Sequence, residues 1–234
     1  MKALLITVCA ILTAADLLLL SMLLTGRPDW FFAKRPPRDL DVVGIQPGQK
    51  MTGIPLESVQ LRDGSARDAS EFWRDKPALV MTASITCPLA RKNLAGFERL
   101  RREFGSQVNF VVVYLIEAHP DNVASPYDVN AEEPWLTEAN RTAGILRAQP
   151  QSLAERQQLA AEFAALPDCN APVWVDRMDN RFWAWIGRAS NLGLLIDQGG
   201  MVLARTGWFD EARLHHALQQ RFGASGDATR VVEY

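Results

Sequence analysis

The sequence has few cysteines and no excess of charge of either sign. Its 234 residues include three cysteines, Cys9, Cys87 and Cys169, which form neither a C-x-x-C pair nor a zinc-ligand spacing. This pattern argues against a disulfide framework and against a structural metal site. The formal net charge is -2, with acids and bases interspersed, so no basic stripe can displace counterions from nucleic acid. DNA and RNA are therefore not expected partners.

One long hydrophobic run is present, at the N-terminus. The 22 residues from Ala3 to Leu24 carry one charge, Asp16, and a helix rising about 1.5 Å per residue would span a bilayer over this length. The mid-span acid costs about 2.5 to 3.5 kcal/mol, which the run's Leu, Ile and Val residues together outweigh. We therefore predict an uncleaved, single-pass transmembrane anchor over residues 1–25. A cleaved signal peptide is the alternative, but the run is long and no small-x-small site follows it before Arg27 and Pro28.

The charges beside this run favour one orientation slightly. Lys2 precedes the run and four basic residues follow it, and positive charge concentrates on the cytoplasmic side of membrane helices. The domain beyond the anchor is therefore expected on the cytoplasmic side. Asp16 would either pair across a helix dimer or be tolerated singly. Residues 26–52, rich in Pro, Gly, Arg and Asp, are expected to form a juxtamembrane linker.

Beyond the linker, hydrophobic runs alternate with helical patterns, which is typical of an α/β domain. Apolar runs predict strands near 58–62 and at 78–83, 108–116, 173–175, 193–196 and 202–205. Capping signals and apolar faces predict helices that start at Pro88 and Ser152 and that cover 180–186 and 210–222. The order β-α-β-α-β-β-α over residues 53–222 predicts a thioredoxin-like fold, a central mixed sheet flanked by helices. A long polar loop is expected up to about Gln151, and residues 223–234 are expected to form a loose tail.

Cys87 is predicted to lie between the end of a buried strand and a helix opened by Pro88. There the sulfur would face unpaired N–H groups and the positive end of a helix dipole, which favour a reactive thiolate. Lowering a thiol pKa by two units needs roughly 2.7 kcal/mol, whereas a helix terminus usually supplies about 0.3 to 1. The hydroxyls of Ser84 and Thr86 are therefore expected to help. The alternative is that Cys87 is a small buried hydrophobic residue.

Two motifs at a fixed distance resemble a known family. Residues 84–88 read Ser-Ile-Thr-Cys-Pro, and residues 114–120 read Tyr-Leu-Ile-Glu-Ala-His-Pro. This pair resembles the iodothyronine deiodinase family, in which an S-x-T-Sec-P turn precedes a strand ending in Y-x-x-E-A-H-P. The resemblance extends more weakly through the segments at 152–156 and 175–180 to the late Gly-Gly hairpin. It covers most of residues 78–222.

The resemblance implies reductive deiodination of a small, iodinated, phenol-like aromatic substrate. Cys87 would replace the selenocysteine and attack a ring-bound iodine, and an external thiol, acting as co-substrate without any bound cofactor, would reduce the resulting sulfenyl iodide. The family also implies a membrane anchor and a homodimer. The residues that match a chain delivering a proton to the ring carbon are Ser84, Thr86, Tyr114, Glu117 and His119. A histidine beside a carboxylate is a good proton donor near neutral pH, although these two could also be a solvated strand end with a loop cap.

Several positions depart from the family pattern. Because a thiol is less ionised than a selenol, a slower reduction is expected. Ile85 stands where some members carry a second cysteine, which removes one route to a resolving disulfide. Pro150 stands where the family can place a substrate-contacting histidine, and Trp208 where it can place a substrate-clamping arginine. Arg205, three residues before that position, is the other candidate substrate-binding residue.

Three functions remain open from the sequence. The first is a thiol-dependent reductive dehalogenase. The second is a membrane-tethered thiol peroxidase, because a lone cysteine beside a threonine suits attack on a peroxide oxygen. The third is a non-enzymatic thioredoxin-like redox sensor or interaction domain, for which the thiol pKa would stay near its ordinary value.

The roles of three further groups are also open. Cys169 could act as a resolving thiol, although nothing in the sequence brings it near Cys87. Trp183, Trp185 and Trp208 either line a ring-binding pocket or pack in the core, which is the commoner case for tryptophans at helical spacing. His215 and His216 match no motif and are expected at the surface.

Overall fold

The computed structural model describes residues 39–51, 59–61, 69–128 and 132–223. The predicted membrane anchor over residues 1–25 lies outside the described residues. Among the helices that the structure does describe, none combines the length and hydrophobicity needed to cross a membrane. The anchor and its orientation therefore stay predictions.

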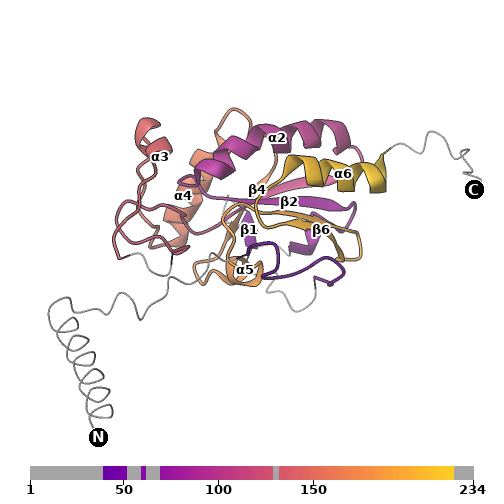
Figure 1. The fold of residues 1–234 in the computed structure, drawn as a ribbon, viewed down its shortest axis with the longest axis horizontal. Helices are drawn as coiled ribbons and strands as arrows, with labels where there is room; N and C mark the ends of the chain where they lie inside the picture. Colours follow the sequence, from indigo (N-terminus) through magenta and orange to yellow (C-terminus); the bar gives the residue numbers. More distant parts are fainter. Residues whose placement is uncertain (1–38, 52–58, 62–68, 129–131, 224–234) are drawn as a thin grey trace, which may run out of the picture. The chain divides into compact units, whose positions relative to one another are not determined.

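A six-stranded mixed sheet forms the centre of the domain (Figure 1). Its strand order is β1-β4-β3-β2-β5-β6. The parallel strands are β2 (Ala78–Ala83), β3 (Asn109–Tyr114) and β4 (Val173–Asp176). The strands antiparallel to their neighbours are β1 (Val59–Leu61), β5 (Gly193–Ile196) and β6 (Val202–Thr206). This arrangement confirms the predicted thioredoxin-like α/β fold with a central mixed sheet.

Helices cover both faces of the sheet. One face carries α2 (Pro88–Phe104), α4 (Leu153–Ala164) and α6 (Glu211–Phe222), and the other carries η2 (Ala69–Phe72) and α5 (Arg181–Trp185) (Figure 1). Because side chains alternate along a strand, Leu79 and Met81 of β2 pack under the first set of helices and Val80 packs under the second. Every residue of β2 is buried, as expected for a strand covered on both faces.

The helix starts follow the predicted capping signals. Ser152 accepts the N–H of Glu155 at 3.2 Å, and Asp210 accepts the N–H of Arg213 at 3.1 Å. Two helical segments were not predicted: the short η2, and α3 (Glu138–Thr142), which lies within the stretch expected to be a loop. The second shows why. Its five residues are too few and too polar to give a hydrophobic period, although Thr137 caps it in the usual way.

The second half of the predicted linker belongs to the folded domain. Within residues 39–51, Ile45 and Met51 are buried. The Met51 N–H donates to the carbonyl of Gly200 at 2.7 Å, and the Gly48 N–H donates to that of Val202 at 2.8 Å. The domain therefore begins before the predicted boundary at residue 53. The sequence did not indicate that this segment is folded, because backbone hydrogen bonds and two isolated apolar side chains hold it, and neither gives a hydrophobic pattern.

Candidate active site

The turn from residue 84 to residue 88 connects the end of β2 to the start of α2. Cys87 is the N-cap of α2, with Pro88 at the first helical position. The Cys87 N–H donates to the carbonyl of Ser84 at 3.1 Å, which closes the turn. Ala83 pairs with Tyr114, so the turn lies beside the end of β3. The predicted strand-turn-helix placement of the cysteine is therefore correct.

The Cys87 thiol is enclosed by the protein and only 2% exposed. Burial raises the pKa of Cys87 above its ordinary value, because a thiolate loses its hydration there. The N–H groups of Ala90 and Leu89, the hydroxyl of Ser190 and the positive charge of Arg91 act in the opposite direction. The sequence left open whether Cys87 is a reactive thiolate or a small buried residue, and the structure shows that it is buried. The free protein therefore holds Cys87 mainly as a thiol at neutral pH.

The serine and threonine expected to assist the sulfur are committed to other partners. The Ser84 hydroxyl accepts the N–H of Ala118 at 3.2 Å. The Thr86 hydroxyl donates to Glu117 at 2.6 Å. The hydroxyl hydrogen-bonded to the Cys87 sulfur is instead that of Ser190, at 3.8 Å. Sequence reasoning missed this residue, since 103 positions separate it from Cys87.

Glu117 is the centre of a buried hydrogen-bond network. Its Oε2 accepts both the N–H of Thr86 at 3.0 Å and the Thr86 hydroxyl, while its Oε1 accepts the hydroxyl of Tyr114. Tyr114 in turn accepts the N–H of Ile85 at 2.9 Å. Glu117 and Tyr114 are fully buried, so the alternative of a solvated strand end is wrong for Glu117. The motif residues 84–86 and 114–117 thus form one connected unit.

Burial also sets the protonation of this network. It raises the pKa of Glu117, against the hydrogen bonds from Thr86 and Tyr114, which favour the carboxylate. Burial together with the neighbouring Glu117 charge raises the pKa of Tyr114 well above its ordinary value, so the phenol keeps its proton. The network therefore places a neutral phenol and a carboxyl group of raised pKa close to the cysteine turn.

His119 lies at the outer end of the network. Its backbone N–H donates to the Thr86 hydroxyl at 3.1 Å. Its half-buried ring packs edge-on against the ring of Trp135, with 4.7 Å between the ring centroids. Among the described residues, its Nδ1 atom has no hydrogen-bond partner. Burial lowers the pKa of His119, with Arg91 contributing in the same direction and the Trp135 backbone opposing. The ring is therefore neutral at neutral pH.

Two residues that sequence reasoning did not single out brace the cysteine turn. Asn140, buried on α3, donates to the carbonyl of Thr86 at 2.8 Å. Its side-chain oxygen accepts from Arg91 at 2.8 Å, and the same guanidinium binds the carbonyl of Ile85. The unpredicted helix α3 thus contributes directly to the geometry of the site.

Two further buried ionisable residues, Arg156 and Asp176, lie between α4 and β4. Arg156 is almost fully buried, and its guanidinium binds the carbonyls of Asp176 at 3.1 Å and Arg177 at 2.7 Å. The Asp176 carboxylate accepts the N–H groups of Phe182 at 3.3 Å and Trp183 at 3.0 Å. Burial raises the pKa of Asp176 to about 6. These contacts connect α4, β4 and α5 beneath the site.

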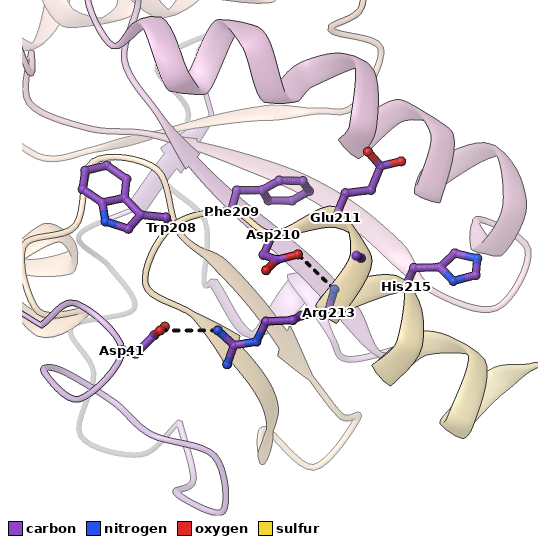
Figure 2. A pocket seen from close by; sticks show the side chains of 8 residues that line it. Asp41, Trp208, Phe209, Asp210, Glu211, Arg213 and His215 are labelled. Atoms are coloured by element: carbon purple, nitrogen blue, oxygen red, sulfur yellow. Dashed lines mark hydrogen bonds and ion pairs between the residues drawn. The ribbon is translucent and has the colours of Figure 1, made fainter.

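The two predicted substrate-binding residues do not contact the cysteine turn. Arg205 is buried and binds the carbonyls of Leu40 and, at 3.2 Å, Ile186. Arg205 lies on β6, so its hydrogen bond to Leu40 attaches the 39–51 segment to the sheet. Trp208 is 51% exposed and lines an open hollow of about 820 Å³. Figure 2 shows this hollow, where Arg213 reaches toward Asp41, and no residue of the cysteine turn lines it.

The remaining candidates lie apart from the sulfur. Trp183 is buried and packs edge-on against Tyr127 at 5.4 Å, as a core residue does. Cys169 is half-buried after α4 and forms no disulfide with Cys87, so its role as a resolving thiol stays a prediction. His215 contacts Glu103 at 3.1 Å on the surface, and His216 is exposed, as expected.

Comparison with curated sequences gives relatives for this arrangement. The family model of iodothyronine deiodinase matches residues 55–207. Type II iodothyronine deiodinase of Homo sapiens is 35% identical over 162 residues, covering 68% of this chain and 56% of that protein. The protein of the same name from Gallus gallus is 33% identical over 141 residues, covering 59% and 47%. The chain spans about half the length of these relatives.

Comparison with solved structures gives more distant likenesses. A putative thiol:disulfide interchange protein DsbE from Chlorobium tepidum is 14% identical, with 75% of this chain and 97% of that chain covered and a TM-score of 0.49. A thioredoxin-like protein from Aeropyrum pernix is 12% identical, with 70% and 88% covered and a TM-score of 0.46.

The fold and the site together define a thioredoxin-like domain with a cysteine at the start of its first long helix and a buried Tyr-Glu-Thr network beside it. The chain belongs to the iodothyronine deiodinase family. The resemblance noted from its two motifs is confirmed.

Proposed function

We propose that this protein is an oxidoreductase that removes iodine reductively from an aromatic ring, with Cys87 as the nucleophile. The observation that supports this most is the buried network joining Tyr114, Glu117 and Thr86 to the cysteine turn. Burying ionisable groups is costly unless they are hydrogen-bonded, and buried groups with shifted pKa values are concentrated at functional sites. Reductive deiodination needs both a sulfur nucleophile and a proton delivered beside it.

The proposed first step transfers iodine to sulfur and a proton to carbon. The Cys87 thiolate attacks the iodine, the carbon–iodine bond breaks, and its electron pair remains on the ring carbon. That carbon takes a proton, which gives the deiodinated ring and a sulfenyl iodide on Cys87. In this proposal the proton is supplied through Tyr114, Glu117 and Thr86, which are joined by hydrogen bonds, and burial raises the pKa of Glu117. His119 adjoins this network through its backbone N–H, which donates to the Thr86 hydroxyl, and its half-buried ring is proposed as the link to the exterior.

The proposed second step returns the enzyme to its starting state. An external thiol attacks the sulfenyl iodide, releases iodide and forms a mixed disulfide with Cys87. A second thiol then releases Cys87 as the free thiol and leaves as a disulfide. The substrate class is an iodinated, phenol-like ring. The single-pass anchor, the cytoplasmic domain and a homodimer are carried forward as expectations from the sequence and the family.

Iodide release tests this proposal. The full chain, in detergent with excess dithiol, is incubated with thyroxine or with a small iodophenol, beside Cys87→Ser and the control Cys169→Ser. We expect iodide from the wild type and from Cys169→Ser, and none from Cys87→Ser. If no ring is deiodinated while micromolar peroxide oxidises Cys87 rapidly, the peroxidase function replaces the proposed one. If neither occurs, the domain is a passive sensor or interaction module.

A further inference from the structure

The hydroxyl group hydrogen-bonded to the Cys87 sulfur comes from a distant part of the chain. The neighbouring hydroxyls of Ser84 and Thr86 are bonded elsewhere. The Ser190 hydroxyl lies 3.8 Å from the sulfur, within hydrogen-bond reach for a sulfur atom, and Ser190 is only 5% exposed. Ser190 belongs to none of the motifs on which the family resemblance was based. It therefore needs an explanation of its own.

The loop that carries Ser190 is fixed to the strand that leads to the cysteine. Asn191 donates to the carbonyl of Thr82 at 3.0 Å and accepts from Asn93 of α2 at 2.6 Å. The Leu192 N–H donates to the Thr82 hydroxyl at 2.9 Å. Thr82 and Asn191 are fully buried. Because both ends of the contact are tied to β2 and α2, the Ser190 hydroxyl is held in place before any substrate arrives.

The other groups near the sulfur leave a need for such a donor. Arg91 of α2 favours the thiolate by its charge, and helix N–H groups do so by their dipoles. Tyr127, on the loop after His119, interacts electrostatically with Cys87 and stays a neutral phenol, because burial raises its pKa. Burial of the sulfur opposes ionisation and is the largest single influence. A further hydrogen bond to the anion would offset part of this.

A hydroxyl group can accept a hydrogen bond from the thiol and can donate one to the thiolate. In the resting enzyme the Cys87 S–H donates to the Ser190 oxygen. Once the thiol is ionised, the serine O–H can rotate and donate to the sulfur instead. Hydrogen bonds to a charged partner are roughly twice as strong as neutral ones, so this exchange favours the thiolate.

We propose that Ser190 is a catalytic residue whose hydroxyl donates a hydrogen bond to the Cys87 thiolate and so makes the sulfur nucleophilic. The inference rests on the proposed function only in one respect: the atom that the sulfur attacks is taken to be iodine. The effect on the sulfur itself applies to any electrophile. It can therefore be measured without deiodination.

The pH dependence of Cys87 alkylation tests the inference. The full chain is treated with iodoacetamide across pH 6 to 11, and modification of the Cys87 peptide is followed by mass spectrometry. In Ser190→Ala the midpoint should rise by about one pH unit, and the rate at neutral pH should fall several-fold. Ser190→Thr, which keeps a hydroxyl, should return toward the wild type. Ser125→Ala is the matched control, a buried serine whose hydroxyl donates to the Ala118 carbonyl at 2.6 Å.

Thermal unfolding shows which variants are folded, and Ser190→Gly replaces Ser190→Ala if the latter is not. An unchanged midpoint in the folded variant lacking the hydroxyl overturns the inference. An equal rise in Ser125→Ala also overturns it, because general loosening of the site would then be the cause. A raised midpoint without any iodide release by the wild type would support the role of Ser190 and reject the proposed deiodination. Iodide release with an unchanged midpoint would do the reverse.

Discussion

The turn around Cys87 and the loop around Trp208 leave the sheet at the same edge, because β2 and β6 run in the same direction. They differ in how they are built. The cysteine turn is buried, and Glu117, Tyr114 and Asn140 are among the residues that form hydrogen bonds with its polar groups. The Trp208 loop faces an open hollow whose charged side chains, among them Arg213, lie at the surface.

The difference determines how easily each region can change in sequence. Buried polar groups are costly to disturb, so the cysteine turn can hold only one geometry. Exposed ion pairs contribute about 0 to 1 kcal/mol, so the side chains of the hollow can change with little effect on folding. This is consistent with family motifs that persist at Glu117 and His119 and a departure at Trp208.

The largest effect is expected from Glu117→Gln. The variant keeps the shape of the side chain but removes the ionisable group to which Thr86 and Tyr114 are bonded. We expect iodide release to fall roughly 10²- to 10⁴-fold, the usual contribution of a proton-transfer group. Single-turnover measurements should place the loss in the step that releases the deiodinated ring.

Glu98→Gln is the control for Glu117→Gln. Glu98 is also a buried glutamate, and it bonds to Arg101 and to the N–H of Asn170 at 3.2 Å, away from the cysteine turn. It should lose stability without losing turnover. Similar losses of turnover in both variants would mean that Glu117 acts only by holding the fold together.

The next effect concerns stability and pH, through Asp176. Its pKa is raised from 3.8 to about 6 in the folded protein, so the folded state binds the proton more tightly than the unfolded state does. This contribution to stability is complete below pH 4 and is lost as the pH rises toward 6, a change of about 3 kcal/mol. In Asp176→Asn, which has no group that titrates at this position, this pH-dependent loss of stability should be absent.

Urea unfolding at pH 4 and pH 7 measures this effect. The unfolding free energy of Asp176→Asn minus that of the wild type should increase by about 2 to 2.5 kcal/mol between the two pH values. Subtraction removes the titration of all other groups. A difference that is equal at both pH values would show that Asp176 ionises normally.

A smaller loss is expected from Asn140→Ala. Removing this amide leaves the Thr86 carbonyl and one arm of Arg91 without their bonds, which should cost about 1 to 3 kcal/mol. Turnover should fall by about tenfold, because the turn is less well held. Asn109→Ala, which removes a bond to the Phe72 carbonyl at 3.1 Å far from the turn, should affect only the melting temperature. Equal turnover in the two variants would mean that α3 does not position the turn.

The parts of the site that the sequence predicted correctly are the local ones. The helix start at Pro88 and the strand before Cys87 follow from apolar runs and capping signals within a few residues. The motif at 114–120 pointed to Glu117 but not to its burial.

The parts that escaped prediction depend on long-range polar contacts. Ser190 reaches Cys87 across 103 positions and Asn140 reaches Thr86 across 54, and a single polar side chain has no periodicity that could signal either. The placement of residues 39–51 was missed for a similar reason, since their backbone bonds go to Gly200 and Val202. Burial of the thiol follows from the packing of all these segments together, which no local pattern contains.

The smallest effect on folding, and the sharpest test of the comparison, is expected at Trp208. Its side chain is half exposed, so Trp208→Arg should change the unfolding free energy by no more than about 0.5 kcal/mol. The variant restores the charge that the family resemblance places at this position. If the hollow recognises substrate, the ratio of kcat/KM for thyroxine to that for iodophenol should rise several-fold, mainly through KM. Arg181→Ala, which removes an exposed pair with Asp179 at 3.0 Å outside the hollow, should leave the ratio unchanged. An unchanged ratio in Trp208→Arg would mean that the hollow does not recognise the substrate. The cysteine turn and its surroundings would then have to provide both recognition and chemistry.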